Sequence, residues 1–162
     1  MITENGKEVL LFLEKLNITY TRHEHPPVYT VEEASRYYDQ MKGAQCKNLF
    51  LRNNKGNRHY LVILEDSKRA DLKQLAEKVG ESKLSFASAK RLFKYLGVEA
   101  GSVSAFGLIN DRNKEVVVVL DKDLQNEDWI NFHPNVNTAT LTISRDDFMR
   151  YLGHCGNRLL TY

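Results

Sequence analysis

The chain has 162 residues, of which 42% are apolar and 27% are charged, a composition that suits one globular domain with a continuous core. Its 23 Lys and Arg residues nearly balance 21 Asp and Glu residues, and the formal charge of +2 excludes a protein that coats nucleic acid by charge alone. Any contact with nucleic acid must therefore come from a local patch.

The apolar runs are short. The longest, Leu61 to Leu64 and Val116 to Leu120, are far below the roughly 20 residues that a membrane helix needs, so we expect a soluble protein. The first residues lack a cationic start followed by an apolar block, and no secretory signal is expected. With only Cys46 and Cys155, a cytoplasmic chain with free thiols is the expectation.

The first 38 residues predict two helices with an edge strand between them. Val9, Phe12, Leu13 and Leu16 recur at helical spacing, and Asn17 is a plausible terminator. Residues 20–25 alternate like an edge strand that the following prolines end. Residues 30–33 form a capping box, in which Thr30 and Glu33 satisfy backbone N–H groups reciprocally, and a helix should run to about residue 38.

The remaining elements mix strands and helices. A hairpin is predicted from residues 48–52 and 59–65, and its second strand should be covered on both faces. The Val116 to Leu120 run is placed at the centre of the sheet. The other expected elements are a helix over 71–79 ended by Gly80, a strand over 83–87, a helix from Ser88 to Gly97, a strand over 138–143 and a helix over 144–152.

No repeat or linker interrupts the sequence, so residues 1–162 are expected to form one domain. Because strands and helices do not alternate strictly, the predicted fold class is α/β (α+β), with a mixed, strongly curved sheet and helices packed outside it.

The sequence gives little support for a metal site or for a catalytic nucleophile. His23 and His25 share a strand face, but no third and fourth ligand follow at zinc-site spacing. Cys46 beside Lys47 could be a thiolate of lowered pKa, yet no triad partner is spaced to complete it, and a buried thiol is the commoner case. No phosphate-binding glycine motif occurs. Neither a metal nor an organic cofactor is expected.

Three segments are more informative. Lys47 stands at the entrance of an apolar strand, as a solvated end residue or as a site lysine. The loop over residues 101–107 has two glycines and two serines, which let backbone groups approach a ligand closely, although an ordinary connector would look the same. His133, in the polar stretch over 132–140, is either a capped turn residue or a site residue.

Several motifs of the chain follow one another as they do in a known family: residues 25–34, 46–51, 84–88, 96–98, 101–104, 106–111, 132–135 and 137–140. In the sequence and order of these motifs the chain resembles the YbaK/ProX superfamily of trans-editing aminoacyl-tRNA deacylases, and specifically its branch of free-standing prolyl-tRNA editing proteins. The resemblance implies the superfamily's mixed domain with a curved, barrel-like sheet.

The sequence departs from the family at one position. The family's glycine loop usually runs Gly-x-x-x-Pro, and here Ala105 takes the last place. Because proline would fix φ and limit the unfolded ensemble, alanine should cost the loop roughly 0.4 to 1 kcal/mol of preorganisation.

Carried over by motif, the family implies that Lys47 is the catalytic lysine, an electrostatic and positioning group during hydrolysis of the aminoacyl ester. A small pocket would accept alanine and exclude the proline ring, so the implied substrate is Ala-tRNA(Pro). The implied pocket residues are Pro26, Val28, Tyr29, Asn48, Gly101, Ser102, Val103, Ser104, Ala105 and His133.

The expected partner is the acceptor end of aminoacyl-tRNA(Pro), with prolyl-tRNA synthetase as a further candidate and neither membrane nor DNA. Cations on two predicted helices and a preceding loop offer a modest basic surface, although a solvated helix face explains them equally well: Lys68, Arg69, Lys73, Lys90, Arg91 and Lys94. A deacylase for Cys or another small amino acid, and a non-catalytic tRNA-binding or synthetase-binding module, are the alternative functions.

Overall fold

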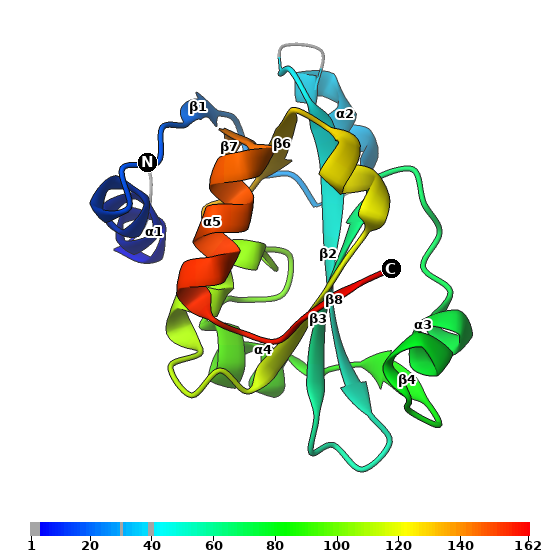
Figure 1. Cartoon of the computed structure of the whole chain (residues 1–162). Helices are drawn as coiled ribbons and strands as arrows, with labels where there is room; N and C mark the ends of the chain where they lie inside the picture. The colour runs from blue at the N-terminus through cyan, green and yellow to red at the C-terminus, as the bar shows by residue number, and fades with distance from the viewer. Residues whose placement is uncertain (1–3, 30, 39–40) are drawn as a thin grey trace.

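The computed structural model describes residues 4–29, 31–38 and 41–162, which form five α-helices and eight strands within those ranges (Figure 1). The helices are α1 (Glu4–Lys15), α2 (Val31–Tyr38), α3 (Leu72–Val79), α4 (Ala89–Leu96) and α5 (Arg145–Cys155), with short 3-10 helices η1 (Ala105–Asn110) and η2 (Lys122–Asn126). The strands are β1 (Thr21–Glu24), β2 (Ala44–Asn53), β3 (His59–Glu65), β4 (Leu84–Phe86), β5 (Val116–Leu120), β6 (Trp129–Phe132), β7 (Ala139–Ser144) and β8 (Leu159–Thr161).

Local signals set most helix ends. Asp71, Ser88 and Ser144 each accept a hydrogen bond from the backbone N–H three residues on, and so cap α3, α4 and α5. Gly80 and Gly97 adopt the left-handed conformation that ends α3 and α4. These boundaries confirm the sequence prediction. Thr30 of the predicted capping box lies outside the described residues.

The strands form one mixed sheet in the order β1-β7-β6-β2-β3-β5-β8, and β4 pairs with the second half of β2. The hairpin of β2 and β3 is antiparallel as predicted, whereas β6, β5 and β8 pair in parallel with β2, β3 and β5. The described strands leave β1 and β8 at opposite ends of this order. The sheet is therefore not closed into a barrel, and the predicted fold class, a mixed sheet flanked by helices, is confirmed.

Two further expectations about the sheet are corrected. The Val116 to Leu120 run is not central, because only the three-residue strand β8 lies beyond β5. Its apolar sequence reflects burial of both faces. The hairpin's first strand begins at Ala44 and not at residue 48, because Ala44 and Gln45 pair with β6, a strand that the sequence analysis did not predict.

The core lies on both faces of the sheet. On one face, α1, α4, α5 and η1 surround a cluster that includes Phe106, Phe132 and Tyr151. On the other, α3 packs Leu75 against Leu64. Figure 1 shows α3 and α5 on opposite sides of β2 and β3. Both faces of β3 are thus covered, as its apolar sequence predicted. Among the described helices, none is both long and apolar enough to span a membrane.

Candidate functional site

Three loops that are distant in sequence meet beside the sheet, and together we call them the loop junction: residues 25–29, 101–104 and 133–140. The Ser104 hydroxyl donates a hydrogen bond of 2.5 Å to the carbonyl oxygen of His133. The Asn137 amide donates to the carbonyl oxygen of Val28 at 3.4 Å. These contacts bring together segments that the sequence analysis could only propose one by one.

Glycine is required where the second loop passes the first. Gly101 has a φ of +90°, and a Cβ built on it would lie 3.7 Å from the ring of Tyr29. The Tyr29 ring is 73% exposed, so it stands over the loop at the surface. The Cβ would make only an ordinary van der Waals contact with that ring, so it is the positive φ that would strain a side chain at position 101. The predicted pocket residues Val28, Tyr29, Gly101, Ser104 and His133 therefore lie together.

The remaining members of the glycine loop run inward. Ser102 is half-buried, Val103 packs against the main core, and Ala105 is fully buried as the first residue of η1. Ser104 caps η1 by accepting a hydrogen bond from the Phe106 N–H. The exposed part of the loop is therefore its glycine end. Pro26, at the start of the first loop, is exposed.

Two histidines lie close enough at this junction to influence each other electrostatically. Burial lowers the pKa of His133, His25 lowers it further, and the His133 Nδ1 lies 3.4 Å from the carbonyl oxygen of Ala139, which opposes the change. His133 is therefore neutral at pH 7. The ring of His25 stacks on Tyr37 of α2 at 5.3 Å, and its Nε2 lies 2.9 Å from Thr140 Oγ1. The sequence analysis treated His25 as an edge-strand residue and missed its place here.

Lys47 lies inside β2 and not at its entrance, since β2 begins three residues earlier. It pairs with Leu64 of β3, and its side chain shares a face with Gln45, which pairs with Asn131 of β6. The side chain is half-buried. Burial and Glu65 raise the pKa of Asp66, whereas the positive charge of Lys47 lowers it, so the ammonium lies near that carboxylate.

Asn48 and Cys46 occupy the opposite face of β2 from Lys47, because side chains alternate along a strand. The Asn48 amide approaches the Cys46 sulfur at 3.8 Å, and that sulfur lies 3.2 Å from the carbonyl oxygen of Asn131. Burial raises the pKa of Cys46, so the thiol stays protonated. The predicted neighbours Lys47 and Asn48 therefore diverge, and Cys46 is not an activated nucleophile.

A cavity of about 370 Å³ is lined by residues of α1, of α4 and of two loops of the loop junction. Ser102 and Asn137 connect it to the loop junction, and Phe93 of α4, with 65% of its surface exposed, stands at its rim. The residues that line it are Asn5, Phe93, Gly97, Glu99, Ser102, Asn135, Val136, Asn137 and Thr138.

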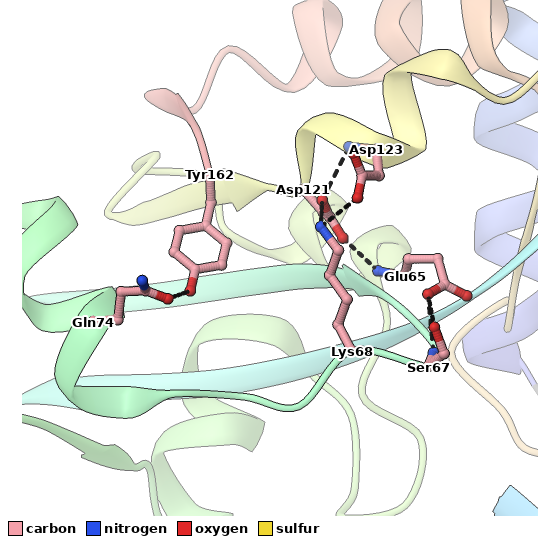
Figure 2. A network of polar contacts seen from close by, with 7 residues as sticks. All are labelled: Glu65, Ser67, Lys68, Gln74, Asp121, Asp123 and Tyr162. Carbon is pink, nitrogen blue, oxygen red and sulfur yellow. Dashed lines mark hydrogen bonds and ion pairs between the residues drawn. The ribbon is translucent and has the colours of Figure 1, made fainter.

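The cations predicted to contact tRNA fall on two surfaces, one at α3 and one at α4. The Lys68 ammonium lies 2.6 Å from an Asp121 carboxylate oxygen and 2.7 Å from one of Asp123, as Figure 2 shows. Arg91 donates to the carbonyl oxygen of Gly56 at 2.8 Å. Both cations are engaged within the protein. Lys73 on α3, Arg69 before it, and Lys90 and Lys94 on α4 are exposed.

Comparison with known proteins matches residues 25–151 to the aminoacyl-tRNA editing domain family. The chain is 45% identical over 149 residues to a prolyl-tRNA editing protein ProX of Acetoanaerobium sticklandii, with 92% of this chain and 91% of that protein covered. It is 36% identical to prolyl-tRNA synthetase associated domain-containing protein 1 of Danio rerio, with 90% and 80% covered.

The fold has been seen before. A crystal structure described as a candidate trans-editing enzyme for prolyl-tRNA synthetase superposes with a TM-score of 0.74 at 19% identity, with 99% of this chain and 98% of that one covered. At this identity the likeness establishes the fold alone, and it agrees with the mixed sheet and flanking helices described above. The chain therefore belongs to the aminoacyl-tRNA editing domain family, and with it to the aminoacyl-tRNA deacylases.

Proposed function

We propose that this protein is a trans-editing enzyme that hydrolyses the aminoacyl ester of mischarged tRNA(Pro), with Ala-tRNA(Pro) as its main substrate. The 45% identity to a prolyl-tRNA editing protein over nearly the whole of both chains carries this proposal. The loop junction supports it, because residues implied by the family resemblance come together there across more than 100 residues of sequence.

Hydrolysis of the aminoacyl ester requires few catalytic groups. An aminoacyl ester is already activated, so the site must orient it, place a water molecule and stabilise the negative charge that develops on the carbonyl oxygen. We assign charge stabilisation to the ammonium of Lys47. Lys47 does not act as a nucleophile, since the substrate has no ketone or aldehyde on which a Schiff base could form.

The loop junction would position the substrate. The Gly101 backbone is exposed at the surface beside Tyr29, where no Cβ obstructs a ligand. His133 is neutral, so it can donate or accept a hydrogen bond without adding charge. Within the family resemblance, the hydroxyl of the terminal ribose assists the attacking water.

Selectivity would come from size. A cavity fitted to alanine excludes the proline ring sterically. In contrast, the aminoacylation site of a synthetase, which must hold proline, rejects alanine by only a few kcal/mol. Alanine would therefore be removed from tRNA(Pro) while the correct product survives. We place the reaction in the cytoplasm, with the tRNA acceptor end as the partner and prolyl-tRNA synthetase as a further candidate.

One assay tests the proposal. Purified protein is incubated separately with tRNA(Pro) charged with Ala, Cys, Ser or Pro, and loss of the ester is measured. We expect Ala-tRNA(Pro) to be hydrolysed fastest and Pro-tRNA(Pro) to survive. Faster removal of Cys would assign the protein to the alternative small-amino-acid specificity. Binding of tRNA without hydrolysis of any ester would identify a non-catalytic module.

A further inference from the structure

The start of β2 lies beside the ends of the parallel strands β3, β5 and β8, along the edge of the sheet at which these three strands end. Lys47 pairs with Leu64, near the end of β3, and Leu120 at the end of β5 pairs with Thr161 at the end of β8. Because neighbouring strands lie about 5 Å apart, residues that follow β5 at this edge are on the order of 10 Å from β2. Lys47 thus shares this edge with the loops that follow β3 and β5.

A depression of about 690 Å³ opens at this edge, and we call it the strand-end depression. Figure 2 shows the polar contacts made by residues at this edge. Lys68, from the loop after β3, bonds Asp121 and Asp123 after β5, and the buried Asp121 also accepts a hydrogen bond from the Glu65 N–H. On the α3 side, the Tyr162 phenol donates to the side chain of Gln74. The lining residues are Lys68, Arg69, Gln74, Glu77, Lys78, Lys122 and Tyr162.

The charge of the depression is positive. The two aspartates neutralise Lys68, and this interaction raises its pKa. Arg69, Lys78 and Lys122 are exposed, and among the described residues none of these three has an ion-pair partner. Glu77 supplies one opposing carboxylate. Three cations without an ion-pair partner therefore line an open surface, and one of them, Lys122, follows β5, two strands from the strand of Lys47.

We propose that the strand-end depression binds the phosphate backbone of the tRNA acceptor strand whose terminal ester lies at Lys47. This rests on the proposed function. Cations spread around an open depression suit a chain of phosphates, each contacted separately, better than one compact anion. Of the residues that the sequence suggested for tRNA, Arg69 keeps that role, Lys68 organises the surface, and Lys78 and Lys122 are added.

The test is binding of an uncharged acceptor-stem hairpin of tRNA(Pro) that ends in single-stranded CCA, measured by fluorescence anisotropy over a range of salt concentrations. The variant Arg69→Gln/Lys78→Gln/Lys122→Gln should bind at least about tenfold more weakly at low salt. The slope of log affinity against log salt should fall by about two to three, because each lost phosphate contact removes about 0.7 to 0.9.

Two comparison variants make the result decisive. Lys15→Gln/Lys55→Gln/Lys83→Gln removes the same charge from exposed positions elsewhere and should stay within about twofold of the unmodified protein. Lys90→Gln/Lys94→Gln tests the α4 surface. Equal losses for both triple variants, or a loss confined to the α4 variant, would overturn the proposal. Because the hairpin carries no ester, this outcome is independent of whether the protein hydrolyses Ala-tRNA(Pro).

Discussion

The phenol of Tyr151 donates a hydrogen bond of 2.9 Å to the carbonyl oxygen of Ala105, in a part of the core where both side chains are fully buried. This bond ties α5 to the first residue of η1, which is also the last residue of the glycine loop. Ser104, one residue earlier, bonds His133. The inner end of the loop is therefore fixed from two sides, although it lacks the proline typical of the family.

Replacing Ala105 by proline should stabilise the protein by about 0.4 to 1 kcal/mol. Ala105 is the first residue of η1, where proline is favoured, and the described hydrogen bonds give its N–H no acceptor. Ser104 has φ −152° and ψ 149°, the extended conformation that a residue before proline prefers. Thermal melts and Ala-tRNA(Pro) hydrolysis on the same preparation measure the effect.

The opposite result, destabilisation by Ala105→Pro, would contradict this prediction. The pyrrolidine ring needs space beside a fully buried residue, and overpacking typically costs 1 to 3 kcal/mol, on the order of the gain or more. A variant destabilised by more than about 1 kcal/mol and slowed about tenfold would mean that the loop does not have the family's geometry.

Lys47→Ala should reduce deacylation by about 10²- to 10³-fold, the usual loss when one group that stabilises developing charge is removed. Lys47→Met serves as the matched control, because it retains an unbranched apolar stem in the half-buried position. Both variants should lose activity alike while the melting temperature changes little. Activity within about threefold of the unmodified protein, in either folded variant, would remove Lys47 from the mechanism.

Stability should fall as the pH is lowered below about 6.5, because His59 is buried in its neutral form. Burial, helped by Arg91, Arg52 and Lys94 and opposed by Asp111, lowers the pKa of His59 from 6.5 to about 4. Between these values the unfolded chain binds the proton first, so free energy of unfolding is lost as the pH falls, by about 2 kcal/mol between pH 7 and pH 5.

Urea unfolding of the unmodified protein and of His59→Gln at those two pH values tests this prediction. The variant cannot titrate at position 59, so its stability should change less with pH. Identical pH profiles for the two proteins would show that other groups cause the acid sensitivity.

Arg91→Lys should destabilise the protein by about 1 to 2 kcal/mol. Its guanidinium reaches two acceptors at once, the Gly56 carbonyl oxygen at 2.8 Å and His59 Nε2 at 3.0 Å. A lysine ammonium cannot reproduce that planar geometry, and His59 would lose its donor inside the core. Chemical denaturation measures the loss, and exposed Lys90→Gln, on the same helix, should change stability by less than about 0.5 kcal/mol.

The sequence by itself determined most of the helix ends and the identity of the family, although α5 runs to Cys155, beyond its predicted end at residue 152. A cap such as Ser88 or Ser144 bonds a backbone group three residues away, and Gly97 adopts a conformation that few other residues tolerate, so these signals are complete within a few residues. The motifs that resemble editing deacylases are likewise short continuous stretches of sequence, and they indicated the loops that meet at the junction.

Only the tertiary structure decided which residues face one another. The sequence analysis did not predict the strands β6 and β8, which exist because distant strands pair with them. The pairing with β6 also moved Lys47 from a strand entrance to a strand interior. From the sequence Lys68 was predicted to be a cation available to tRNA, whereas in the fold it contacts Asp121, which lies 53 residues later in the chain. Partners of this kind are set by the packing of whole elements, which no short stretch of sequence contains.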